Sequence, residues 1–143
     1  MPYRFLEDVA IADVAFEAEG RVLPELFKEA ALAVTNTMVQ DLSRIEHKVA
    51  KRIKGAAENI EMLLFHFLQD LIFYKDADLL LFSDFQLTIV QREGEWHLHG
   101  TAYGEEISPD RHQLLVDVKA VSLHKYQVQK TAKGWRAVVI LDV

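Results

Sequence analysis

A lysine inside an apolar run is the residue of this chain that most needs a chemical explanation. Lys119 lies within residues 114–123, LLVDVKAVSL, which is otherwise largely aliphatic and typical of a β-strand. Removing an ammonium group from water is costly, so a lysine held among aliphatic side chains needs an acidic partner or a task. Asp117 would share its face of a strand, and an ion pair on a solvent-facing surface is the simpler interpretation. The residues alone favour that ion pair over a functional role.

Two aspartates could supply oxygen ligands for a hard cation. Asp13 and Asp142 are far apart in the sequence, but each falls on a predicted strand, and Asp142 stands next to Val143. Their side chains and a terminal carboxylate would make an all-oxygen site. Aspartates at strand ends are also ordinary turn residues, so the spacing leaves both interpretations open. With nearby histidines, the same carboxylates could instead serve a small metal-dependent hydrolase.

The histidines give no complete catalytic or metal-binding pattern. His97 and His99 lie two residues apart on one face of a predicted strand, a pair that lacks a third ligand and is expected to be exposed. His112 follows a Pro-Asp-Arg turn and His124 ends the apolar run. A general base needs a partner within hydrogen-bond reach, which a sequence does not show. No phosphate-binding glycine loop, Gly-x-Ser-x-Gly elbow or nucleotide-binding fingerprint occurs.

Two helices and a set of strands must position these residues. Apolar residues at helical spacing predict helices over residues 23–40 and 58–74. Alternating patterns predict strands over residues 3–9, 12–18, 44–54, 79–82 leading into 85–92, 96–103, 115–130 and 135–143. The order β-β-α-β-α-β-β-β-β implies an α+β fold, with two helices packed on a largely antiparallel sheet. Residues 1–143 are expected to form a single domain.

The composition bounds the classes of function. Cysteine is absent from the 143 residues, which excludes a disulfide, a thiolate zinc site and a cysteine nucleophile, and suits a reducing cytosol. The net charge of −6 argues against direct binding of nucleic acid, which usually needs a basic face. The basic residues within 48–54 are expected to form a solvated edge strand. No signal peptide follows Met1, and the apolar runs are too short to span a membrane, so a cytoplasmic protein is expected.

Several short segments, taken together and in order, resemble one family. They are Phe5-Leu6-Glu7 with Ala12-Asp13-Val14, residues 63–68 (LLFHFL), Gly104-Glu105 with Asp110-Arg111-His112, residues 118–124 (VKAVSLH), and Leu141-Asp142-Val143. Each segment is only a few residues long, but the ordered set covers most of the chain. On this basis the sequence resembles the archease family, small proteins that assist the RtcB-type tRNA-splicing RNA ligase.

The resemblance implies a non-enzymatic accessory protein. The ligase joins a 3′-phosphate or 2′,3′-cyclic phosphate end to a 5′-hydroxyl, after guanylylation of its own histidine with GTP and manganese. Archeases promote that guanylylation and repeated turnover, and the contact with the ligase is expected to be transient. In the family the matching aspartates and the last residue hold a divalent ion, often Ca²⁺, which implies Asp13, Asp142 and Val143 as metal ligands. It also implies that Asp13, Lys119 and Asp142 take part in ligase activation.

One segment departs from the family pattern. Archeases usually carry His-Thr-Ala-Asp at the first metal-binding aspartate, whereas this chain has Ala10-Ile11-Ala12 before Asp13. The aspartate is kept and the histidine is not, which affects the local geometry of the predicted site more than membership of the family. Two other classes of function stay open. One is the metal-dependent hydrolase described above, and the other is a general chaperone-like module that binds unrelated proteins.

Overall fold

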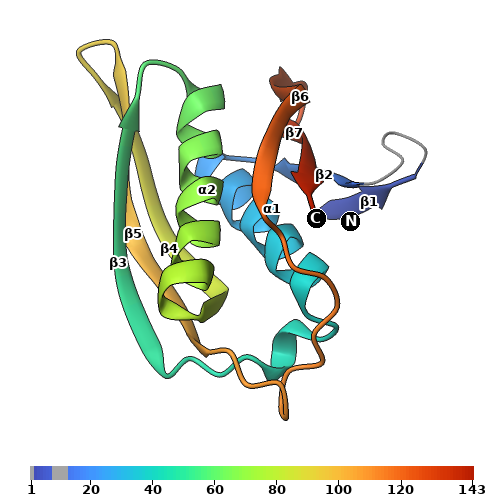
Figure 1. The fold of residues 1–143 in the computed structure, drawn as a ribbon. Coiled ribbons are helices and arrows are strands. Elements are labelled where there is room, and N and C mark those ends of the chain that lie inside the picture. The colour runs from blue at the N-terminus through green and yellow to red at the C-terminus, as the bar shows by residue number, and fades with distance from the viewer. Residues whose placement is uncertain (1, 8–12) are drawn as a thin grey trace.

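The computed structural model describes residues 2–7 and 13–143, which form seven strands and two long helices (Figure 1). In chain order the elements are β1 (Tyr3–Leu6), β2 (Val14–Gly20), α1 (Leu23–Met38), the 3-10 helix η1 (Leu42–Arg44), β3 (Val49–Ala57), α2 (Ile60–Asp78), β4 (Leu80–Arg92), β5 (Glu95–Glu106), β6 (Ala120–Thr131) and β7 (Gly134–Asp142). The predicted order of strands and helices and the α+β class are confirmed.

The strands divide into two antiparallel sheets, where the sequence predicted one. The four-stranded sheet has the order β1-β2-β7-β6, and the three-stranded sheet has the order β3-β5-β4. Both helices contact strands of both sheets, and Figure 1 shows α2 between β3 and β6. The helices therefore share one hydrophobic core with the two sheets.

Apolar packing and end contacts explain why the two helices form where they do. α1 has Pro24 in its first turn, and Glu25 accepts a hydrogen bond from the backbone N–H of Arg21 at 3.1 Å. α2 begins at Asn59, whose side chain accepts from the backbone N–H of Met62 at 2.9 Å. It ends at Leu79 in the left-handed conformation. Between these ends each helix buries a stripe of apolar side chains.

Strand β7 lies inside the four-stranded sheet and pairs with a strand on each side. β2 pairs with β7 on one side, with Val14 opposite Leu141, and β6 pairs on the other side, with Ala120 opposite Asp142. Figure 1 shows the C-terminus beside the start of β6. Three segments distant in sequence therefore meet at this end of the sheet.

Some predicted boundaries were wrong. The third predicted strand begins at Val49 and not at residue 44, because Leu42–Arg44 forms a 3-10 helix capped by the Asp41 side chain. Residues 79–82 and 85–92 belong to one strand, β4, with an irregularity between Phe82 and Asp84. Residues 115–119 precede β6 and are not part of it. β1 ends at Leu6, and the Ala10-Ile11-Ala12 segment lies outside the described residues.

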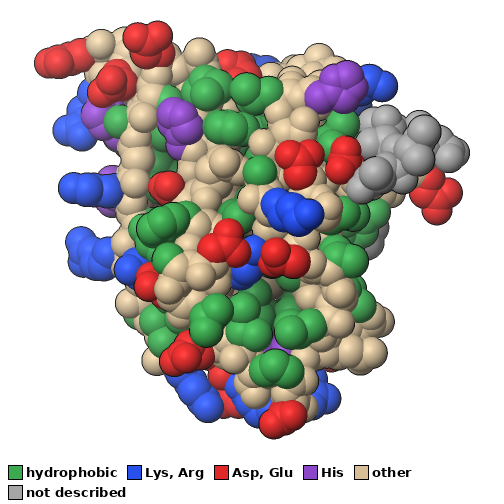
Figure 2. Space-filling model, in the orientation of Figure 1, with side chains coloured by type: hydrophobic (Ala, Val, Ile, Leu, Met, Phe, Trp, Pro, Cys, Tyr) green, Lys and Arg blue, Asp and Glu red, His purple; other side chains and the backbone are tan. Residues whose placement is uncertain are grey.

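The topology agrees with the interpretation of the basic residues in 48–54. β3 is an edge strand of its sheet, and Arg52 and Lys54 are exposed on it. Figure 2 shows basic side chains along the left edge of the molecule, where Figure 1 places β3. Charged side chains on an edge strand discourage pairing with another sheet. In the part of the chain that the structure describes, no helix is long and apolar enough to cross a membrane.

Candidate functional site

Asp142 is the centre of the candidate site. It is the last residue of β7 and lies directly opposite Ala120, the first residue of β6. The backbone N–H of Lys119 donates to the carbonyl oxygen of Asp142 at 2.8 Å. On the other side of β7, Val14 lies opposite Leu141, so Asp13 comes next to Asp142 at the same end of the sheet. The fold thus places Asp13, Lys119 and Asp142 at the same end of the four-stranded sheet.

The four residues of the predicted site remain accessible to solvent. Asp13, Asp142 and Val143 are half-buried and Lys119 is exposed. Figure 2 shows acidic side chains grouped beside the grey residues, with a basic side chain next to them. A site at the end of a sheet, formed by backbone pairing and open to water, can be reached by an ion or by another protein.

The donor set of this site suits a hard divalent cation. The Asp13 and Asp142 carboxylates and the main-chain oxygen of Val143 are all oxygen ligands, which Ca²⁺ and Mg²⁺ prefer. Among the described residues no group of three His, Cys, Asp or Glu side chains is placed to hold a metal ion. The predicted site has two such side chains, so backbone oxygens and water would have to complete the coordination. Metal binding here stays a prediction.

Lys119 is exposed, which agrees with the solvent-facing position that the residues alone favoured, but the predicted ion pair with Asp117 was wrong. Its run is not a regular strand, and neighbouring Leu115 and Val116 are themselves exposed, at 49% and 45%. The buried lysine is Lys75 on α2, which is only 5% exposed. Asp117, the predicted partner of Lys119, pairs with Lys75 at 2.6 Å. The apolar run around Lys119 is therefore only partly buried, because Leu115 and Val116 are exposed whereas Val118 and Val121 face the core.

A buried ionic cluster holds the loop between β5 and the Lys119 segment. The carboxylate of Glu105 accepts hydrogen bonds from Arg111, from His112 at 2.9 Å and from the backbone N–H of Glu46 at 2.7 Å. The backbone N–H of Ser108 donates to Nδ1 of His112 at 2.9 Å. In neutral His112 the hydrogen is therefore on Nε2, which donates it in the hydrogen bond to Glu105. The sequence pointed to this loop but not to the ion pair, because a lone Glu and His seven residues apart match no motif.

Removing this cluster is expected to destabilise the fold in a pH-dependent way. Hydrogen bonds from Arg111 hold the pKa of Glu105 at about 2, below its usual 4.5. Since the folded-state pKa is lowered, the stabilisation is complete above pH 4.5 and is lost as the pH falls towards 2. In urea unfolding, Glu105→Gln should cost about 1–3 kcal/mol at neutral pH, and the difference from wild type should shrink in acid. The exposed neighbour provides the control Glu106→Gln, and a difference that stayed constant with pH would contradict the assignment.

The other histidines do not join the Asp142 site into a larger constellation. His97 is half-buried and lies 3.3 Å from Glu95, while His99 and His124 are exposed. The expectation of exposure was therefore right for His99 and only partly right for His97. His112 is fully committed to Glu105 and Ser108.

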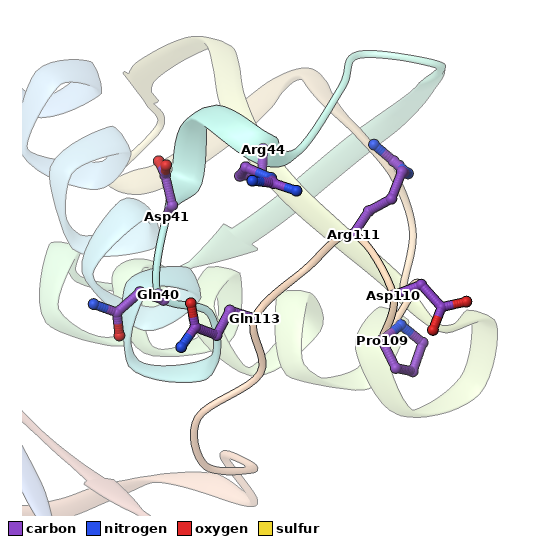
Figure 3. Close-up of a pocket in the computed structure, with 7 residues that line it drawn as sticks. All are labelled: Gln40, Asp41, Arg44, Pro109, Asp110, Arg111 and Gln113. Atoms are coloured by element: carbon purple, nitrogen blue, oxygen red, sulfur yellow. The ribbon is translucent and has the colours of Figure 1, made fainter.

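A hollow of about 400 Å³ lies apart from the predicted site (Figure 3). It is formed by the chain after α1 and by the loop after β5, where the backbone N–H of Gln40 donates to the carbonyl oxygen of Gln113 at 2.8 Å. Arg44 and Arg111 also line it. Asp13, Lys119, Asp142 and Val143, the site residues that the resemblance implied, do not line it.

Comparison with known proteins decides the family. A model described as the archease protein family (MTH1598/TM1083) matches residues 3–143. This chain belongs to the archease family. Protein archease of Pyrococcus furiosus is 35% identical over 133 residues, which cover 92% of this chain and 93% of the relative. Protein archease of Methanothermobacter thermautotrophicus is 37% identical over 132 residues, with the same coverage of both chains.

Solved archease structures share the fold. The solution structure of protein 1598 from Methanobacterium thermoautotrophicum matches with a TM-score of 0.84 at 33% identity, over 99% of each chain. A crystal structure from Thermotoga maritima, described as an archease and possible chaperone, matches with a TM-score of 0.59 over 94% of this chain and 93% of that one. At 17% identity the second likeness concerns the fold alone.

Proposed function

We propose that this archease is an accessory protein that activates the RtcB-type RNA ligase, promoting its guanylylation and its repeated turnover. The observation that supports the proposal most directly is the meeting of Asp13, Lys119 and Asp142 at one end of the four-stranded sheet. Lys119 and Asp142 are joined by a backbone hydrogen bond of 2.8 Å. Three residues that share no local sequence are thereby held together and accessible in a chain that belongs to the archease family.

The chemistry of this end of the sheet suits contact with a charged active site. We assign Asp13, Asp142 and Val143 as the ligands of a divalent ion, with Ca²⁺ as the expected ion. A bound ion would offset the two carboxylates, which otherwise repel each other. The exposed ammonium of Lys119 would then be free to meet phosphate or carboxylate groups of the ligase or its nucleotide. The protein itself would supply contacts and no covalent chemistry.

The experiment that tests the function is an assay of the cognate ligase with this archease added below stoichiometry. Guanylylation and RNA ligation would be measured over many turnovers, with GTP and manganese present. Many ligations per ligase molecule only in the presence of the archease would support the proposal. An unchanged ligase would contradict it, and protection of unrelated proteins from aggregation would then favour the chaperone-like alternative. Turnover of generic phosphoesters by the archease alone, with metal, would favour the hydrolase.

Activation is expected to weaken as salt is added. The proposed contact is electrostatic and transient, and the Debye length falls from about 10 Å at 0.1 M salt to about 3 Å at 1 M. The archease concentration needed for half-maximal activation should therefore rise severalfold with added potassium chloride, with less change in the maximal effect. Basal ligation without archease, measured at each salt concentration, is the control. A half-activating concentration independent of salt would indicate an apolar contact instead.

A further inference from the structure

The buried lysine of α2 is placed to control the segment that carries Lys119. The Lys75 ammonium donates to the carboxylate of Asp117 at 2.6 Å and to the carbonyl oxygen of Val118 at 2.7 Å. It also pairs with Asp76 at 2.5 Å. Asp117 and Val118 are the two residues directly before Lys119. One side chain thus fixes the backbone on the N-terminal side of the proposed activating lysine.

The C-terminal side of Lys119 is held independently. The backbone N–H of Val121 donates to the side-chain oxygen of Gln69 at 2.7 Å, and Gln69 lies on α2 about two turns before Lys75. The backbone N–H of Lys119 itself donates to Asp142. Residues 117–121, which include Lys119, are therefore held by hydrogen bonds to α2 and to the end of β7.

Lys75 is suited to this task because it stays charged although it is buried. Burial by itself lowers the pKa of Lys75, but the hydrogen bonds to Asp117 and Asp76 outweigh this effect and raise it above its usual value. A charged group in a poorly solvated position is held tightly to its partners, because releasing them would leave the charge uncompensated. Val118, whose carbonyl oxygen Lys75 binds, is itself fully buried. Together these contacts make a rigid support next to an exposed side chain.

We infer that Lys75 is a positioning residue for ligase activation, which sets the place of Lys119 relative to Asp142 by holding Asp117 and Val118. The inference rests on the proposed function, because it assigns Lys75 a role through Lys119. Lys75 does not contact the partner, since it is buried under the segment it holds. It should affect how well a docked archease activates, and affect much less how tightly it docks.

The first test compares Lys75→Met with Lys28→Met. Lys28 is the control, because it also projects from a helix and pairs with a carboxylate, that of Asp84, at 2.8 Å, but it is more exposed and lies on α1. Lys75→Met should lower maximal ligase activation about tenfold with little change in the half-activating concentration, since misplacing a group by about 1 Å can cost up to about a hundredfold. Lys75→Arg should restore part of the loss. Lys28→Met should leave activation unchanged.

A second variant, Asp117→Asn, and a measurement of amide hydrogen exchange distinguish a positioning role of Lys75 from general unfolding of the variant. Asp117 is exposed, with 66% of its side chain accessible, so Asp117→Asn should leave the fold intact while it weakens the hold of Lys75. Amide hydrogen exchange in the archease alone should become faster at Lys119 in Lys75→Met and Asp117→Asn, and stay unchanged in Lys28→Met. Exchange at the core of α1 should be equal in all variants.

The outcomes separate this inference from the proposed function. Full activation by Lys75→Met, with unchanged exchange at Lys119, would overturn the positioning role even if Lys119 proves essential. Lower activation with equally fast exchange throughout the protein would also overturn it, because the effect would then be general destabilisation. If Lys119→Ala itself leaves activation intact, the proposed role of Lys119 fails, while the exchange experiment still decides whether Lys75 holds the segment.

Discussion

Lys119→Ala is expected to leave a folded archease that no longer activates the ligase. The side chain is exposed, and the hydrogen bond to Asp142 comes from the backbone N–H, which alanine keeps. Surface substitutions of this kind usually change the free energy of unfolding by no more than about 0.5 kcal/mol. The loss of activation should be large, about a hundredfold or more, if the ammonium meets a phosphate or carboxylate in a desolvated contact. Guanylylation of the ligase in a single turnover measures this effect without interference from product release.

Lys133→Ala is the matched control for this experiment. Lys133 is an exposed lysine in the turn at the far end of the same β6–β7 hairpin, so its removal changes the net charge equally. Loss of activation in both variants would indicate that overall charge matters and not the position of Lys119. Lys119→Arg adds a further distinction, because it keeps the charge while changing the geometry of hydrogen bonding. An unfolded Lys119→Ala protein, or one that activates normally, would be contrary to the assigned role.

The secondary structure was largely predictable because it depends on local periodicity. The apolar stripe of α2 predicted its start to within two residues, and Asn59 fixes that start by capping the helix. In β2, the alternating residues Phe16 and Ala18 are fully buried, as expected for one face of a strand. The partner of a strand, however, is often distant in the sequence and does not follow from local periodicity. No feature of the chain between Val49 and Glu106 marks these strands as a separate sheet, so the division into two sheets came only from the structure.

The site was predicted through the family resemblance, and the residues alone would have missed most of it. Asp13 comes next to Asp142 because β2 pairs with β7, and Lys119 comes next to Asp142 because β6 pairs with the other side of β7, a non-local arrangement that spacing does not reveal. Lys75 was overlooked because it stands beside Asp76 near the end of a helix, a pattern typical of a solvated surface. Its burial results from the loop before β6 crossing over it, which brings Asp117 from 42 residues away. Buried polar groups with distant partners are the features that sequence patterns describe least well.

Asp142→Asn is expected to abolish most of the proposed divalent-ion binding and, with it, most of the proposed activation. The substitution keeps the shape of the side chain and the backbone hydrogen bond from Lys119, but removes a negative charge from a site with two carboxylate side chains. Calcium affinity depends strongly on the number of charged ligands, so the Kd for Ca²⁺ alone should rise at least about tenfold by titration calorimetry. Asp13→Asn should have the same effect, and the exposed loop residue supplies the control Asp110→Asn.

Metal binding should also be visible in thermal stability. An ion that binds only the folded protein stabilises it by about 2.7 kcal/mol at a concentration a hundredfold above its Kd, so Ca²⁺ should raise the Tm of the wild type and of Lys119→Ala, but not of Asp142→Asn. This pattern would separate the two parts of the site, with the aspartates holding the ion and the lysine meeting the ligase. An equal rise in all three proteins would mean that the ion binds elsewhere. Activation that survives in Asp142→Asn without bound ion would leave Lys119 as the functional residue and reduce the aspartates to a structural role at the end of β7.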